Sequence, residues 1–229
     1  MKERPILFSG PMVRAILSGQ KTQTRRVMRE QICEPGVVRM ACPGYCEVVN
    51  EHGVSIPGFR CPYGKPGDRL WVREAHHRTT DGRSILIGYE VPGENREYEA
   101  PGVGRVREFR HHLGGWGGRV SRNFPSIHMP RWASRITLEI TGVRVERLQD
   151  ISEADAFAEG IQRLENHSWN AGPARPLGTY RGLDEWSEDE GFWTDAVSAY
   201  AALWDSINGP GAWDANPWVW VVEFKRIKP

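Results

Sequence analysis

The feature that most constrains this sequence is a short apolar strand followed by a short helix and a basic turn. Residues 5–8 are apolar, and Val13, Ile16 and Leu17 recur at spacings of three and four, as on one face of a helix. Gly19 ends this helix as a C-cap would. The segment KTQTRR follows at once and gathers hydroxyls and cations on one turn. Such a turn is typical of an anion or nucleic-acid site, although a solvated basic loop has the same composition.

Composition excludes several classes of protein. The chain has 229 residues, 39% of them hydrophobic, and a formal net charge of +1. A nearly neutral chain has no global field that attracts a polyanion, so any nucleic-acid contact must be a local patch or a nucleotide-sized pocket. The first residues do not resemble a signal peptide, and no apolar run approaches the length of a membrane span. We therefore expect a cytoplasmic globular protein that makes no membrane contact.

Apolar alternation predicts strands, and cap signals mark two further helices. Strands are expected over 69–74, 84–90, 135–145 and 217–227; the last is apolar on both faces, as a central strand would be. One helix opens at the capping box Ser152–Asp155 and ends near Gly160, and another spans about 189–207. Residues 30–63, 91–130 and 165–188 are expected as long loop insertions because they are rich in turn-forming or polar residues. The pattern predicts an α+β fold, a small mixed β-barrel with a few flanking helices.

All four cysteines lie in the first of these insertions. They are Cys33, Cys42, Cys46 and Cys61, and His52 lies among them. A reducing compartment argues against disulfides, and the Cys42-x3-Cys46 spacing falls within the range of structural zinc ligands. The cysteines are therefore candidate ligands of a structural zinc ion, with His52 as a substitute for one of them; the alternative is four unrelated thiols.

Four landmarks carry a family resemblance. They are ILSGQKTQTR at 16–25, KPGD at 65–68, the segment 148–161 and WVVEF at 220–224. In this order they resemble the ASCH domain, a PUA-like β-barrel linked to RNA and modified-nucleoside chemistry. The phrases at 126–135 and 208–217 resemble the longer phage and prophage-encoded branch of that family. The resemblance spans about residues 5–228 and implies one PUA-like domain over 1–229, with the three insertions added to it.

The resemblance also implies an activity. Small bacterial ASCH proteins include amidohydrolases that remove the acetyl group of N4-acetylcytidine with a Lys and a Thr of the Lys-Thr-x-Thr motif and a Glu from a later helix. These three match Lys21, Thr24 and Glu159 here, and the reaction requires no cofactor. A buried neutral amine beside a hydroxyl can take its proton, and a carboxylate can accept or return one, so the sequence leaves the identity of the base open.

Other residues are candidates for substrate binding: Thr22, Arg25, Arg26, Trp71, Glu74, His128, Arg131 and Trp132. The two neighbouring arginines could hold a phosphate or pair with carboxylates, and the two tryptophans could stack on a base or pack in the core. The expected partner is a modified nucleoside or a single-stranded nucleic acid. The alternative functions are a non-catalytic RNA, single-stranded DNA or modified-base binding module, a ribonuclease, and a phage accessory protein.

Overall fold

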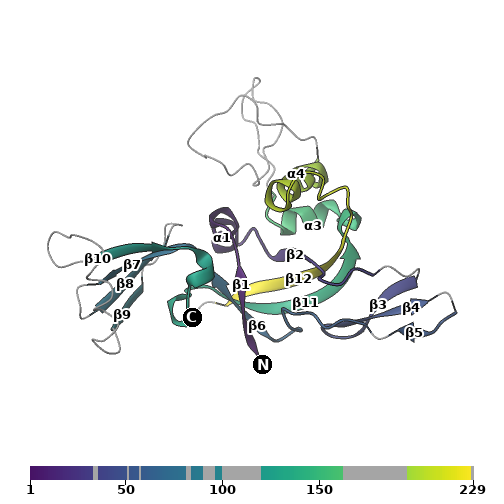
Figure 1. Ribbon diagram of the computed structural model, residues 1–229, viewed down its shortest axis with the longest axis horizontal. Helices are drawn as coiled ribbons and strands as arrows, with labels where there is room; N and C mark the ends of the chain where they lie inside the picture. The colour runs from purple at the N-terminus through teal and green to yellow at the C-terminus, as the bar shows by residue number, and fades with distance from the viewer. Residues whose placement is uncertain are drawn as a thin grey trace, which may run out of the picture.

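The computed structural model describes residues 1–32, 36–50, 52–56, 58–80, 84–89, 96–99, 120–161 and 195–227. These residues form a mostly β structure with few helices, so the expected α+β class is confirmed (Figure 1). The strands are β1 (Glu3–Leu7), β2 (Gln23–Val27), β3 (Gly36–Cys42), β4 (Tyr45–Asn50), β5 (Ser55–Ile56), β6 (Arg69–Arg73), β7 (His76–Thr80), β8 (Ser84–Tyr89), β9 (Arg96–Glu99), β10 (Val120–Phe124), β11 (Thr137–Arg147) and β12 (Trp218–Ile227). The α-helices are α1 (Gly10–Leu17), α3 (Glu153–Ala158) and α4 (Ala196–Asn208), and the 3-10 helices are η1 (Ser126–His128), η2 (Arg131–Ala133) and η3 (Leu148–Asp150). The insertion expected at 165–188 lies outside the described residues.

A five-stranded sheet organises the molecule, in the order β1-β6-β11-β12-β2. Strand β1 pairs with β6 in parallel, and the other neighbours are antiparallel. The expected central strand over 217–227 is confirmed as β12, which lies between β11 and β2. A bulge between Ile140 and Gly142 shifts the register of β11 against β12, at the glycine that interrupts the apolar alternation.

Strand β12 separates two apolar clusters, which explains why both of its faces are apolar. Trp220 and Val222 belong to the larger cluster, together with Val13 and Ile16 of α1 and apolar residues of β6 and β11. Val219 and Val221 point to the other face, where they pack with apolar residues of α3 and α4, which stack on each other there (Figure 1). Among the described residues, none of the helices is both long enough and apolar enough to cross a bilayer.

The expectation of a loop over 30–63 is wrong. Its described residues form a three-stranded antiparallel sheet in the order β3-β4-β5. Pro43 and Gly44 form the two-residue connection of a hairpin in which Cys42 opposes Tyr45, and Gly44 has a φ of 78°. Turn-forming residues between two short strands are the signature of a hairpin, so this Pro-Gly pair marks the joint between β3 and β4.

The insertion at 91–130 is also more regular than expected. Strands β9 and β10 lie within it and join β7 and β8 in a four-stranded sheet of order β10-β7-β8-β9, which projects from the side of the molecule (Figure 1). Helix η1 follows β10. These strands are not predicted from the sequence because the segment is polar and rich in glycine, so apolar and polar residues alternate only weakly along it.

Candidate active site

Lys21 stands where the first helix turns into the sheet. Gly19, with a φ of 79°, ends α1, and the amides of Gln20 and Lys21 both donate to the carbonyl of Ala15. The next amide, of Thr22, donates to the carbonyl of Ala158, and the carbonyl of Thr22 accepts from Phe224. The basic turn is therefore fixed by backbone bonds to α1, to α3 and to the sheet.

Glu159 reaches Lys21 from the end of α3. The capping box of Ser152 and Asp155 starts this helix as expected. Glu159 is its C-cap, and Gly160 follows with a φ of 104°. The Lys21 Nζ lies 2.5 Å from Glu159 Oε2 and 2.8 Å from the Glu159 backbone oxygen, so Lys21 binds both a side chain and the helix end. The expected meeting of Lys21 with Glu159, 138 residues apart, is thus present in the structure.

This ion pair is buried, with 1% of the Lys21 side chain and 4% of the Glu159 side chain exposed. Burial lowers the pKa of the Lys21 ammonium, and the Glu159 carboxylate opposes that shift. The second carboxylate oxygen, Oε1, is buried and accepts no hydrogen bond from the described residues. Glu159 therefore binds Lys21 with one oxygen, and its other oxygen lies 3.8 Å from Arg25 Nη1.

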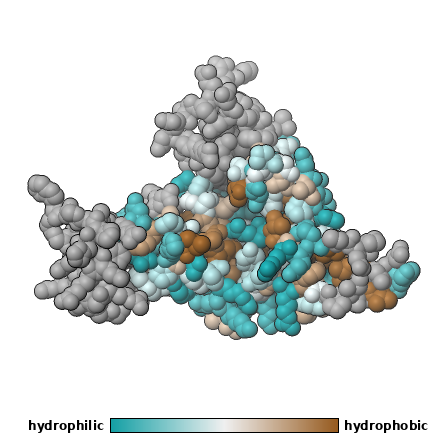
Figure 2. Space-filling view, in the orientation of Figure 1, coloured by the Kyte–Doolittle hydropathy of each residue, from teal (hydrophilic) through white to brown (hydrophobic). Residues whose placement is uncertain are grey.

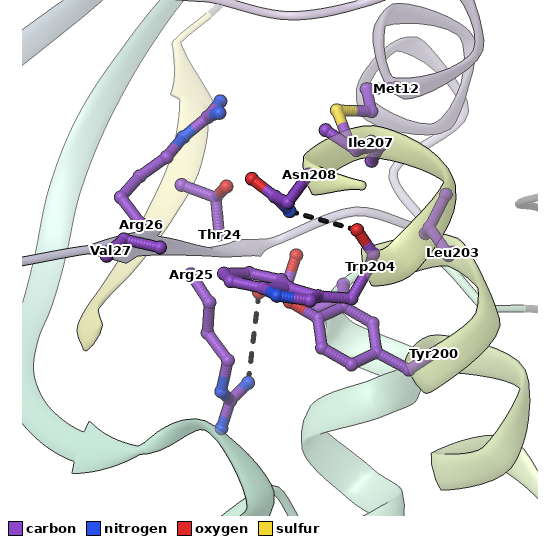
Figure 3. A pocket seen from close by; sticks show the side chains of 11 residues that line it. Met12, Thr24, Arg25, Arg26, Val27, Tyr200, Leu203, Trp204, Ile207 and Asn208 are labelled. Atoms are coloured by element: carbon purple, nitrogen blue, oxygen red, sulfur yellow. Dashed lines mark hydrogen bonds and ion pairs between the residues drawn. The ribbon is translucent and has the colours of Figure 1, made fainter. Parts of the chain in front are cut away.

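A pocket lies beside this pair, between β2 and α4 (Figure 3). It is lined by Met12, Thr24, Arg25, Arg26, Val27, Glu159, Tyr200, Leu203, Trp204, Ile207 and Asn208. Its volume is about 60 Å³. One water needs roughly 10–15 Å³ on this scale, so the pocket admits several waters or a small planar group. Thr24 is 2% exposed and lines the pocket together with Glu159, which brings the three expected catalytic residues to one place.

The rim of the pocket is partly apolar. Val27 and Ile207 line the pocket and are 47% and 51% exposed. Figure 2 shows hydrophobic residues on this face among hydrophilic ones, in the region where Figure 1 places α1, β2 and α4. A ligand entering here meets apolar side chains first and polar ones deeper inside.

Carboxylates hold Arg25 in the pocket wall. Its guanidinium Nη2 lies 3.0 Å from Glu146 Oε2 and 3.2 Å from Asp155 Oδ2, and its Nη1 lies 3.8 Å from Glu159 Oε1. Arg144 binds Glu146 and Asp155 from the other side. The hydroxyl of Ser152 and the two arginines lower the pKa of Asp155 to about 2, against the opposing effect of burial. Arg25 therefore pairs with carboxylates, the second of the two roles considered for it.

Helix α4 contributes two aromatic side chains. Burial and the charge of Glu159 raise the pKa of Tyr200 well above its usual range, so its phenol stays neutral. The indole of Trp204 lies across the pocket, between the side chains of Asn208 and Arg25 (Figure 3). Its Nε1 is buried and has no hydrogen-bond acceptor among the described residues, and the same holds for Nε and Nη1 of Arg25.

The remaining predicted residues of the basic turn have different surroundings. Arg26 lines the pocket, and its Nη2 donates to the carbonyl of Leu7 at 2.7 Å while its guanidinium lies over the Phe8 ring. Thr22 is exposed and takes part through its backbone. Of these two, only Arg26 has a side chain in the pocket wall.

Five other predicted substrate-binding residues lie away from this pocket, around β6, η1 and η2. Trp71 is buried beneath the guanidinium of Arg73. Glu74 is buried in a two-pronged ion pair with Arg135, at 2.9 and 2.8 Å. Arg131 binds Glu3 at 2.8 Å on the surface. Trp132 is half-buried against Tyr89, Met129 and Ala133. His128 lies in η1 and is exposed. The structure gives four of these side chains packing or ion-pair contacts, leaves the His128 side chain exposed, and places none of the five in the wall of the pocket.

The three described cysteines differ in their exposure to solvent. Cys46 and Cys61 are buried, and Cys42 is exposed. Among the described residues, no three His, Cys, Asp or Glu side chains are grouped so that they could hold a metal ion. Cys33 lies outside the described residues, so the four-cysteine zinc site stays a prediction.

Sequence reasoning missed Trp204 and Asn208 as pocket residues. Tyr200 and Trp204 share the apolar stripe of their helix, and a stripe that packs in a core has the same spacing as one that lines a pocket. Comparisons with protein-family models, curated proteins and solved structures find no match to this chain.

Proposed function

We propose that the protein is an amidohydrolase that removes an acyl group from the exocyclic amine of a modified cytosine, with N4-acetylcytidine as the type substrate. The observation that carries the proposal is the state of Glu159: one carboxylate oxygen is paired with buried Lys21, and the other faces a pocket that Thr24 also lines. A carboxylate that is oriented by a charged partner and lines a pocket beside a hydroxyl is the arrangement that general-base hydrolysis needs.

Glu159 Oε1 accepts a proton from a water molecule as that water attacks the acyl carbon, and a C–O bond forms while the C=O electrons move onto oxygen. The Thr24 hydroxyl donates to this oxygen. When the C–N bond breaks, Glu159 returns the proton to the leaving nitrogen, so cytidine and acetic acid are released and the carboxylate is regenerated. Lys21 orients Glu159 during these steps, because its Nζ holds Oε2 at 2.5 Å.

The fold of the ASCH class is part of the proposal. We infer that the five-stranded sheet corresponds to a PUA-like barrel within a single domain. Its two edge strands, β1 and β2, approach each other at one end, where Arg26 of β2 donates to the carbonyl of Leu7 at 2.7 Å. This link supports a curled sheet.

The test is incubation of the protein with N4-acetylcytidine and detection of cytidine by mass. Glu159→Gln, which keeps the shape and removes the base, should lower kcat by roughly 10²- to 10⁴-fold. Glu153→Gln is the matched control, because Glu153 is exposed on the same helix and should leave kcat unchanged. Binding of N4-acetylcytidine without release of cytidine would contradict the hydrolase and favour a base-binding module; cleavage of RNA instead would favour the ribonuclease.

A further inference from the structure

The indole of Trp204 presents a buried hydrogen-bond donor at the pocket. Trp204 lines the pocket, and its Nε1 has no hydrogen-bond acceptor among the described residues. Arg25 Nη1 and Glu159 Oε1 also make no hydrogen bond there, but they lie 3.8 Å apart and form an ion pair with each other. A buried donor without a partner is unfavourable, so a ligand oxygen that accepts from Trp204 Nε1 is favoured over an apolar group.

The charges of the pocket decide what kind of group this is. Four positive charges surround the pocket, on Lys21, Arg25, Arg26 and Arg144. Four carboxylates of the same ion-pair network balance them: Glu146, Asp155, Glu159 and Glu223. The formal sum is zero, so the surroundings give an anion such as phosphate no net attraction. A neutral group with a hydrogen-bond acceptor for Trp204 fits best.

We propose that the pocket recognises an uncharged planar group with a carbonyl oxygen, and that Trp204 positions that carbonyl by donating from its indole Nε1. The indole nitrogen lies on the edge of the ring toward Arg25 (Figure 3).

This inference rests on the proposed function for its choice of ligand and names the residue that selects it. In N4-acetylcytidine the acyl C=O is such a carbonyl. The carbonyl that Trp204 holds is then the one that water attacks. Trp204 is thus a positioning residue for the substrate carbonyl as well as a wall of the pocket.

The test compares two ligands in two variants. Trp204→Phe removes the N–H and keeps an aromatic ring, and it should raise the KM for N4-acetylcytidine roughly three- to tenfold. It should leave the inhibition constant of N4-methylcytidine unchanged, since that ligand keeps the N–H but lacks the acyl carbonyl. Trp218→Phe is the matched control, because the Trp218 Nε1 already donates to the carbonyl of Ile32, outside the pocket. It should alter neither constant.

The possible results distinguish a failure of this inference from a failure of the proposed hydrolase activity. If N4-acetylcytidine is not turned over, the catalytic proposal fails, and calorimetric binding constants replace KM for the same comparison. Selective weakening of N4-acetylcytidine by Trp204→Phe then still supports the inference. Equal weakening of both ligands, unchanged affinities, or binding of neither ligand would overturn it. Inorganic phosphate at millimolar concentration should not compete, and competition by phosphate would refute recognition of an uncharged group.

Discussion

Replacing Lys21 by Met should destabilise the protein far more than loss of an ordinary ion pair. Lys21 and Glu159 are almost fully buried and lie 2.5 Å apart, and the next cation, Arg25, is 3.8 Å from the other Glu159 oxygen. Removing one member of such a pair leaves a buried charge without its main partner, which costs about 3–5 kcal/mol. For a chain of this size that corresponds to a fall in Tm of roughly 6–20 °C.

The assay is urea unfolding followed by tryptophan fluorescence. Lys225→Met is the matched control, because the Lys225–Glu139 pair is 3.1 Å apart with 63% and 33% of its side chains exposed. An exposed pair of this kind contributes about 0–1 kcal/mol. The double variant Lys21→Met with Glu159→Leu should regain most of the lost stability, since no buried charge is then unpaired. A loss below about 1 kcal/mol for Lys21→Met, or a double variant less stable than the single one, would refute the reasoning.

Two further predictions concern the supports of the site. Gly160→Ala should lower both Tm and activity, because Gly160 has a φ of 104° and an added Cβ would lie 3.3 Å from that of Ala15 and 3.4 Å from that of Lys21; an unchanged Tm would contradict this. Asp155, with its pKa lowered to about 2 from an ordinary 3.8, contributes stability that is complete above about pH 4 and is lost as the pH falls through about 2. Asp155→Asn should therefore be less stable than the wild type at pH 7 and should approach it near pH 2 in thermal unfolding scans, and a difference that does not shrink on acidification would count against the ion-pair account.

The sequence predicts the strands and caps whose signals are local. Alternation marks β6, β11 and β12, and the Ser152 capping box marks the start of α3. The three-stranded sheet of β3, β4 and β5 escapes prediction because a Pro-Gly turn such as Pro43-Gly44 is also typical of loops, and only pairing between strands distinguishes the two.

The candidate site is predictable only in part for a similar reason. Lys21 and Thr24 lie in one short motif, and Glu159 lies at a helix end that a capping box locates, so the family resemblance suffices to name them. The contribution of α4 depends on how that helix packs over β2, which no spacing within the helix reveals. The neutralisation of Arg25 depends on Glu146 and Asp155, two carboxylates more than a hundred residues away in sequence.

The position of β12 has a consequence for how the protein is made. In chain order β12 follows β1, β2, β6 and β11, yet it lies between β11 and β2 in the sheet. During synthesis β2 therefore has no sheet partner until β12 has left the ribosome, although most of the chain is already present. Bringing β2 and β12 together closes a long loop of chain, which is entropically costly and slows folding. Residues 23–27 of β2, which include Thr24, thus gain their sheet partner only at a late stage of synthesis.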